Sequence, residues 1–208
     1  MTATTVLNHG YSIPDAEERA LWRSLVEGVR QRVSERNLDE VILFHGTSER
    51  AVERIMQHGM APVECSHALP SDRRDVDEYG SFWGTIDTAA AYADDNAAER
   101  HRDSRPVIIA IRVSILENDC RIVPDGATVD FPLKGLTRLD DPEVAAYWCD
   151  FGHDHQWHES LRDLGAVVAL HDFLIPIEDL TVIRSMEDFE RMIEARADAK
   201  PAPPSVSP

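Results

Sequence analysis

The chain has few basic residues for its length, and this scarcity argues against a large polyanionic partner. Its 208 residues include 21 Lys and Arg against 38 Asp and Glu, which gives a formal net charge of -17. Such a field opposes non-specific attraction to nucleic-acid phosphates and to anionic membrane surfaces, although a local basic pocket can still hold a small anion. A polyanionic main partner is therefore disfavoured, and no membrane partner is expected.

Cysteine and long hydrophobic runs are also scarce. Cys65, Cys120 and Cys149 are widely spaced and odd in number, which is typical of reduced thiols rather than of a disulfide framework. Nowhere do about 18 apolar residues follow one another, and the first twenty residues lack a basic segment followed by an apolar one. We expect a soluble, cytoplasmic protein.

The apolar content of 43% is enough to bury a core, and the length lies near the upper end of one ordinary domain. Expected strands and helices are mixed without a regular βαβ rhythm, which favours an α+β fold. Residues 1–38 are expected to form a helical extension packed on the core. Residues 39–197 are expected to form the main domain, and the Pro-rich residues 198–208 a disordered tail.

Hydrophobic periodicity and capping residues predict a series of elements along the chain. Helices are expected from about Asp15 to Asn37, from Ser48 to Gly59, from Thr88 with Asp87 as N-cap, and over residues 142–148, 157–164 and 186–198. Strands are expected at residues 41–44, 81–84, 106–116, 166–176 and 180–183. Residues 61–80 are interpreted as a long surface loop, and residues 117–141 as short pieces with turns.

Two segments carry side chains suited to a binding site. His45, Gly46 and Thr47 follow the first apolar run, where they form either an ordinary strand-to-helix turn or a group aimed into a site. Further on, Phe82 and Trp83 precede a helix that carries Tyr92. Flat aromatic faces suit stacking against a planar ring such as nicotinamide, although the same rings could simply belong to the core.

Taken together, the two segments resemble the NAD-binding core of the ADP-ribosyltransferases. The run HGTSERAVERIMQHG, followed by GSFWG and TIDTAAAYA, is similar to the branch that includes diphtheria toxin and the poly(ADP-ribose) polymerases. That branch uses a His, an aromatic residue and a third residue, often acidic, on three strands. The resemblance implies split mixed or antiparallel β-sheets with peripheral helices, and it implies that residues 39–197 are the catalytic domain.

The resemblance also implies a third segment late in the chain, at residues 157–176. There a helix and a glycine lead to an apolar strand, and Asp172 takes the position usually held by Glu. Asp172 would bind the 2′-hydroxyl of the nicotinamide ribose and stabilise the positive charge that develops as nicotinamide leaves. Its side chain is one methylene shorter than Glu, so its reach to a ribose hydroxyl differs.

The remaining roles follow from the same resemblance. His45 would hydrogen-bond the adenosine-side ribose with support from Thr47, and the main chain of Gly46 would hold the nicotinamide amide. Tyr92 would stack on the nicotinamide ring.

Three further residues complete the expected binding set. Phe82 matches a strand position where the family often has Tyr, and Trp83 would fill that position if the register differs by one. Thr85 adds a hydroxyl beside them.

The implied activity is cleavage of the nicotinamide–ribose bond of NAD, used as a substrate, and transfer of ADP-ribose to an unknown acceptor. The acceptor could be a protein, a nucleic acid or a small molecule, and a toxin or phage-defence role with a neutralising partner stays open. The alternatives are an NAD glycohydrolase and a non-catalytic nucleotide-binding module. An NAD-dependent RNA 2′-phosphotransferase is disfavoured because few Lys or Arg residues lie near the motifs.

One cluster suggests a metal by residue type. His153, His155 and His158 lie close to Cys149 in sequence and could bind zinc, but their spacing matches no standard ligand pattern. A solvated acidic loop, or contact with a substrate, explains the same residues. No metal is expected.

Overall fold

A computed structural model describes residues 15–65, 78–97, 104–125 and 157–195, together with residues 142, 143 and 146. Its helices are α1 (Ala16–Arg36), α2 (Glu49–His58), α3 (Ile86–Asp95), α4 (Val113–Asp119), α7 (Trp157–Leu164), η4 (Ile177–Asp179) and α8 (Met186–Glu194). Its strands are β1 (Ile42–Ser48), β2 (Val63–Glu64), β3 (Tyr79–Gly84), β4 (Pro106–Arg112), β5 (Arg121–Pro124), β6 (Ala166–Leu170) and β7 (Thr181–Ile183). The fold is α+β, as the sequence predicts.

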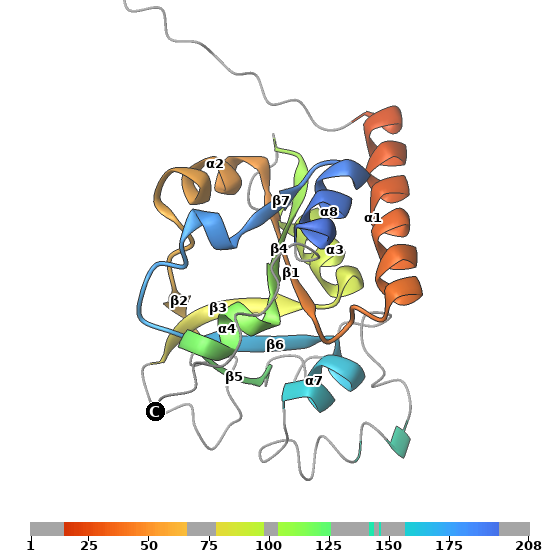
Figure 1. The fold of residues 1–208 in the computed structure, drawn as a ribbon. Helices are drawn as coiled ribbons and strands as arrows, with labels where there is room; N and C mark the ends of the chain where they lie inside the picture. Colours follow the sequence, from red (N-terminus) through yellow and green to blue (C-terminus); the bar gives the residue numbers. More distant parts are fainter. Residues whose placement is uncertain are drawn as a thin grey trace, which may run out of the picture.

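The described strands form one antiparallel sheet that is nearly divided in two. Their order is β5-β6-β3-β1-β4-β7, with β2 added to β3. The β1–β4 ladder spans seven residue pairs and the β3–β6 ladder five, but β1 and β3 share only the pair Phe44–Gly84. The two halves therefore diverge, and in Figure 1 β3, β6 and β5 cross the direction of β1, β4 and β7.

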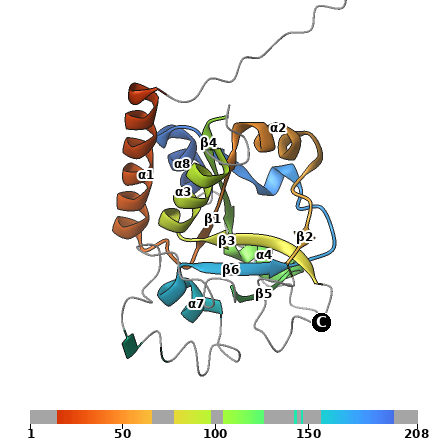
Figure 2. The same cartoon turned by 180° about the vertical axis from the view of Figure 1, so that it is seen from behind.

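Helices α1, α3 and α8 cover one face of the β1–β4–β7 half (Figures 1 and 2). Helix α1 begins at Asp15, which forms a capping box with Glu18, and its buried residues Val26, Val29 and Val33 recur at helical spacing. These valines pack in a cluster with the β1 residues Ile42 and Phe44, with strands β4 and β7, and with α3 and α8. The expected helix to Asn37 is confirmed, and it is part of a core.

The opposite face of the sheet forms a second cluster. Leu43 of β1 alternates with Ile42 and Phe44, and it packs with Trp83 of β3, Ile109 of β4 and Val167 of β6. A third, smaller cluster lies on the other face of the β3–β6–β5 half and contains Cys65, Val123 and Val168, with Phe82 and Leu170 against it.

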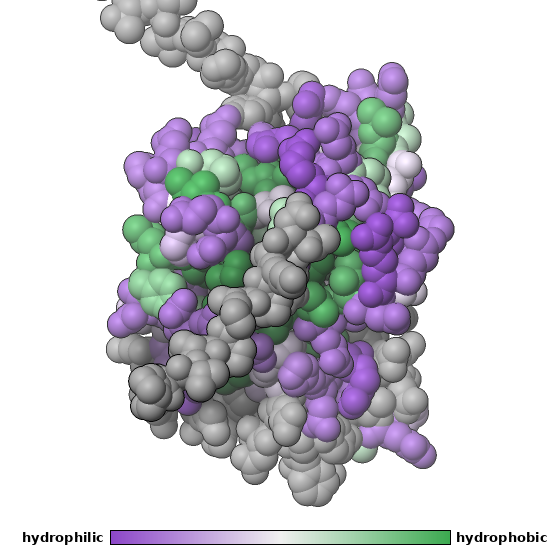
Figure 3. Space-filling model, viewed as in Figure 1, coloured by the Kyte–Doolittle hydropathy of each residue, from purple (hydrophilic) through white to green (hydrophobic). Residues whose placement is uncertain are grey.

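Hydrophilic side chains dominate the side of the molecule where α1 lies, as Figure 3 shows. Hydrophobic colour gathers on the opposite side of this view, where α2 and the segment after β6 lie in Figure 1. Exposed Met56 lies on α2 and exposed Leu174 in the segment after β6, while exposed Val63 lies on β2. The apolar surface therefore adjoins the end of β6.

Several expected boundaries are wrong. Strand β1 runs through His45, Gly46 and Thr47 to Ser48, so these residues form no turn, because β4 pairs with every residue of β1. The strand expected over residues 106–116 ends at Arg112, and the remainder is α4. The strand expected over residues 166–176 ends at Leu170, although Ile175 forms an isolated bridge with Met60.

The start of α3 is also corrected. Thr85 is the N-cap, its hydroxyl accepting from the amide of Thr88, whereas Asp87 lies in the first turn and forms an ion pair with Arg30. Within the loop expected over residues 61–80, β2 and the first residues of β3 are strands.

Other elements agree with the sequence. Ser48 caps α2, which ends at Gly59, and α7 ends at Gly165 in a positive-φ conformation that suits glycine. Most of the helix expected over residues 142–148, and the tail from residue 198, lie outside the described residues.

Candidate functional site

His45 lies where the two halves of the sheet separate. Its ring Nδ1 is 2.8 Å from the main-chain oxygen of Phe82 on β3, while its own backbone pairs with Ile109 on β4. A side chain of β1 is thus hydrogen-bonded to the backbone of β3. Because a carbonyl only accepts, Nδ1 carries the hydrogen and Nε2 is left as an acceptor.

The His45 ring is held in its neutral form. Burial lowers its pKa below the ordinary 6.5, against a smaller opposite effect of the hydrogen bond to Phe82. The ring of Trp83 lies beside it, with centroids 5.7 Å apart and a tilt of 58°. Thr47 follows two residues later on the same face of β1 and is buried. A neutral imidazole with a fixed tautomer can accept a hydrogen bond from a hydroxyl group.

Gly46 is required by the packing of α3 against β1. A Cβ atom at this position would lie 1.8 Å from the main-chain oxygen of Ala89 and 2.7 Å from the main-chain nitrogen of Ala93. The oxygen of Gly46 also accepts a 3.4 Å hydrogen bond from the side chain of Asn96. The absent side chain therefore admits a helix backbone, which the sequence pattern did not indicate.

The two strand aromatics lie on opposite faces of β3. Trp83 is 2% exposed within the large core cluster, and its indole donates to the hydroxyl of Ser81 at 2.7 Å. Phe82 is partly buried and packs against the small cluster with Val123 and Val168. Phe82 and Trp83 therefore line different spaces.

Tyr92 lies on α3, and Thr85 is the N-cap of that helix. Tyr92 is partly buried, and burial raises the pKa of its phenol to about 12, with smaller contributions from Asp125 and Asp95. The Thr85 hydroxyl caps α3 and lies 3.2 Å from that of Thr88, so it serves the helix.

Asp172 follows β6 and is exposed at the edge of a cavity of about 450 Å³. Arg121 lines the same cavity but is engaged by Glu78 through contacts of 3.0 and 3.1 Å. Other residues at this cavity are Tyr79, Asp119, Leu170, His171 and Phe173. Asp172 thus faces an open space with both charges and apolar walls.

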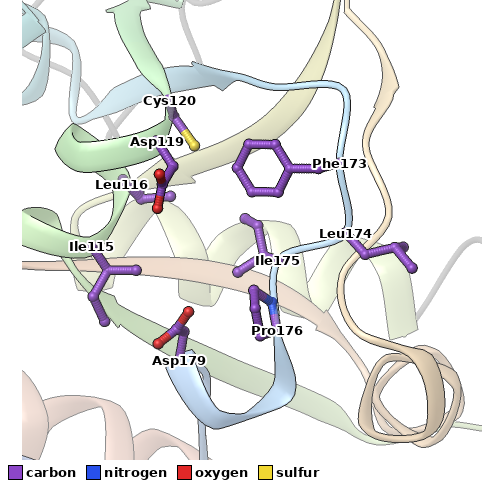
Figure 4. Close-up of a pocket in the computed structure, with 9 residues that line it drawn as sticks. All are labelled: Ile115, Leu116, Asp119, Cys120, Phe173, Leu174, Ile175, Pro176 and Asp179. Atoms are coloured by element: carbon purple, nitrogen blue, oxygen red, sulfur yellow. The ribbon is translucent and has the colours of Figure 1, made fainter.

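A second cavity, of about 310 Å³, shares Asp119 and Phe173 with the first. Figure 4 shows the ring of Phe173 pointing into this space, with Cys120 and Ile175 on either side of it. Asp119 and Asp179 place carboxylates at its border, and burial raises the pKa of Asp179. Neither of the two cavities is lined by His45.

The structure brings the three motif strands together but does not bring every motif side chain into contact. The strands are neighbours in the order β6-β3-β1. His45 is bonded at the level of Phe82, whereas Asp172 lies beyond the pair Gly80–Leu170. Phe82 pairs with Val168, and Asp172 follows Val168 by four residues. At about 3.3 Å per residue, His45 and Asp172 are therefore roughly 13 Å apart along the direction of β6. A ligand that touches both must be extended.

Sequence reasoning missed His171 and Ser81. Their side chains are buried and lie 2.9 Å apart, although Ser81 lies on β3 and His171 directly after β6, and the resemblance implies a role for neither. The one signal in the sequence is the position of His171, immediately before Asp172.

The histidine cluster is only partly described. His158 stacks on Trp157 with ring centroids 3.5 Å apart, and its Nδ1 lies 3.8 Å from a carboxylate oxygen of Glu40. Cys149, His153 and His155 lie outside the described residues. Among the residues that are described, no group of three His, Cys, Asp or Glu side chains is arranged to hold a metal ion.

The other cysteines are described in part. Cys65 and Cys120 are free thiols, the first buried and the second partly buried. No helix within the described ranges is long and apolar enough to cross a membrane.

Comparisons with family models, curated proteins and solved structures give no match to this chain. A functional assignment therefore depends on the motifs and on the geometry of the site.

Proposed function

We propose that this protein is an NAD-dependent ADP-ribosyltransferase, which cleaves the nicotinamide–ribose bond and transfers ADP-ribose to an acceptor. The observation that carries the proposal is the adjacency of the three motif strands, β6, β3 and β1. The resemblance in sequence requires His, aromatic and acidic residues on three strands of one site. His45, Phe82 and Asp172 lie far apart in the sequence. They can belong to one site only if the strands that carry or precede them are neighbours, as β1, β3 and β6 are.

His45 suits the role of a ribose ligand. Its Nδ1–H is held by the oxygen of Phe82, and its lowered pKa keeps Nε2 unprotonated at neutral pH. A ribose hydroxyl is a donor that such a nitrogen can accept. The fixed ring therefore orients the adenosine-side ribose without adding a positive charge.

Asp172 suits the electrostatic role. Its carboxylate accepts no hydrogen bond from another described residue, and it lines an open cavity. As the C–N bond breaks, its electron pair leaves with neutral nicotinamide, and the ribose carbon becomes positively charged. A carboxylate beside that carbon stabilises the charge, and one group of this kind is worth about 10² to 10³ in rate.

The acceptor then completes the reaction. Its lone pair forms the new bond to the ribose carbon, and its proton passes to Asp172 or to water. The cavity of about 310 Å³ adjoins the cavity at Asp172, because Asp119 and Phe173 line both, and an acceptor would bind there. If water takes this place, the protein is an NAD glycohydrolase.

The aromatic residues supply the ring site. Tyr92, a neutral phenol whose pKa is raised to about 12, suits stacking with nicotinamide. Phe82 is an apolar wall on the face of β3 opposite Trp83 and the His45 ring, so it would contact a nicotinamide ring only on that face. Phe82 lacks the hydroxyl that this position often carries in the family. This difference favours the alternative of a non-catalytic binding module.

The test is mass spectrometry of products after the full-length chain is incubated with NAD, alone and with a cell lysate. Wild-type protein should release nicotinamide, and His45→Ala and Asp172→Asn should each reduce the rate by about 10² or more. The matched controls are His58→Ala and Asp39→Asn, which change exposed residues that line neither cavity.

The products separate the alternatives. ADP-ribose attached to a macromolecule or small molecule supports transfer, and free ADP-ribose alone supports a glycohydrolase. NAD binding by calorimetry without nicotinamide release supports a binding module and contradicts the proposed activity.

A further inference from the structure

The residues on either side of Asp172 are hydrogen-bonded within the protein. The backbone N–H of His171 donates to the oxygen of Tyr79 at 2.9 Å, which attaches this end of β6 to β3. The side chain of His171 reaches the other way, and its Nδ1 lies 2.8 Å from the main-chain oxygen of Phe173. The residues before and after Asp172 are thus linked by one imidazole.

The same imidazole is anchored inside the protein. Its Nε2 lies 2.9 Å from the hydroxyl oxygen of Ser81, and that oxygen also lies 2.7 Å from the indole nitrogen of Trp83. Ser81 is 4% exposed, Trp83 2% and His171 7%. These three side chains are therefore largely buried, and their polar atoms need partners within the protein.

For a neutral imidazole, one assignment of hydrogens fits these contacts. The carbonyl oxygen of Phe173 can only accept, so Nδ1 of His171 carries the hydrogen and donates to it. Nε2 is then an acceptor and takes the hydroxyl hydrogen of Ser81, whose oxygen accepts from the indole N–H of Trp83. The directions of the bonds are set by the acceptor at Phe173 and the donor at Trp83.

This buried chain also reaches the other motif. The ring of Trp83 lies against that of His45, with centroids 5.7 Å apart. A continuous series of contacts thus connects the His45 ring with the bend that carries Asp172, through Trp83, Ser81 and His171. Asp172 itself is exposed and lies on a bend, where its backbone would otherwise have considerable freedom.

We propose that His171 is a positioning residue that sets the carboxylate of Asp172 by holding the carbonyl of Phe173. The inference rests on the proposed function, because it assigns Asp172 a role in the reaction. A displacement of about 1 Å in a catalytic group can lower a rate about 10²-fold, so a bond that fixes the bend has a measurable effect on turnover.

Three substitutions separate the two bonds of the imidazole. In His171→Asn the amide nitrogen can replace Nδ1 as donor to Phe173, whereas the contact with Ser81 is lost. In His171→Gln the longer side chain can accept from Ser81, whereas the donor to Phe173 is lost. His171→Leu removes both bonds and replaces the imidazole with an apolar side chain of similar size.

The measurement is nicotinamide release by the full-length protein as a function of NAD concentration, below the melting temperature of every variant. His171→Leu and His171→Gln should lower kcat by about 10- to 100-fold with little change in KM, because the ribose contact of His45 is intact. His171→Asn should recover most of the wild-type kcat. Equal values of kcat for Asn, Gln and Leu variants, or losses that follow only the melting temperature, would overturn the inference.

Amide hydrogen exchange of residues 172–174 gives a readout that does not need activity. Exchange should be faster in His171→Leu and His171→Gln than in the wild type, and close to wild type in His171→Asn. Unchanged exchange in all three variants would refute the anchoring, whatever the activity. Failure of the wild type to release nicotinamide would instead refute the proposed function.

Discussion

Gly46 provides the sharpest test of how the site is built, because its replacement acts through distances that can be measured. In Gly46→Ala the new Cβ atom would lie 1.8 Å from the oxygen of Ala89 and 2.7 Å from the nitrogen of Ala93. Both atoms are backbone of α3. No side chain can rotate away to relieve the contact, so either α3 or β1 has to move.

The size of the effect follows from the first distance. An ordinary contact between carbon and oxygen lies at about 3.3 Å or more, so α3 has to shift by roughly 1.5 Å. Gly46 lies in the middle of the β1–β4 ladder, which resists movement. Overpacking of this kind costs about 3 kcal/mol of unfolding free energy, and at about 2 to 4 °C per kcal/mol the melting temperature should fall by roughly 6 to 12 °C.

Urea denaturation and thermal melting followed by circular dichroism measure this change. The matched control is Gly28→Ala, whose Cβ would meet the flexible side chain of Met186 at 2.8 Å. That variant should lie within about 1 kcal/mol of the wild type, because Ala is a better helix former than Gly and Met186 can move. A loss of less than about 1 kcal/mol for Gly46→Ala would refute the argument that α3 packing requires this glycine.

Three further predictions follow from buried imidazoles, helix capping and the exposed ion pair. Burial lowers the pKa of both His45 and His171 below 6.5, so their neutral forms stabilise the fold fully above that pH, and stability falls as pH drops through the lowered values. Denaturant titrations at about pH 7.5 and pH 5 should show this fall in unfolding free energy, and the fall should be smaller in His171→Asn. If the variant loses as much stability between the two pH values as the wild type, the lowered pKa of His171 is contradicted. Thr85→Ala should lower the unfolding free energy by about 1 kcal/mol through loss of the α3 cap. Asp87→Ala should lower the unfolding free energy by less than Thr85→Ala, because the ion pair of Asp87 with Arg30 is exposed and is worth at most about 1 kcal/mol. Urea denaturation of both variants measures the two losses, and a larger loss for Asp87→Ala would identify Asp87 as the cap.

Much of the local structure could be predicted because it depends on neighbouring residues. Helix α1 follows from valines at helical spacing and from the cap at Asp15, and Gly59 and Gly165 end their helices with positive φ. Such signals act within a few residues and are present in the sequence itself.

The errors occurred where a distant segment decides the conformation. Val113 has strand propensity, yet the chain turns into α4 there, and its amide donates to the oxygen of Val41 at 3.0 Å. Thr85 and Asp87 are both good caps, but the amide of Thr85 bonds to the oxygen of Gly165, which holds Thr85 in an extended conformation before α3. Neither partner is near in sequence.

The candidate site divides in the same way. The residue types available for a site can be read from the sequence, which places His45, the aromatic pair and Asp172 in motifs that resemble one family. The three-dimensional fold is needed to see that β6, β3 and β1 are neighbours, that the His45 ring bonds to the oxygen of Phe82, and that Phe82 and Trp83 lie on different faces. The fold also shows that Gly46 makes room for α3 and that His171 bonds to the oxygen of Phe173. Propensity and capping act over a few residues, whereas strand pairing joins residues up to 90 positions apart, as with Gly80 and Leu170.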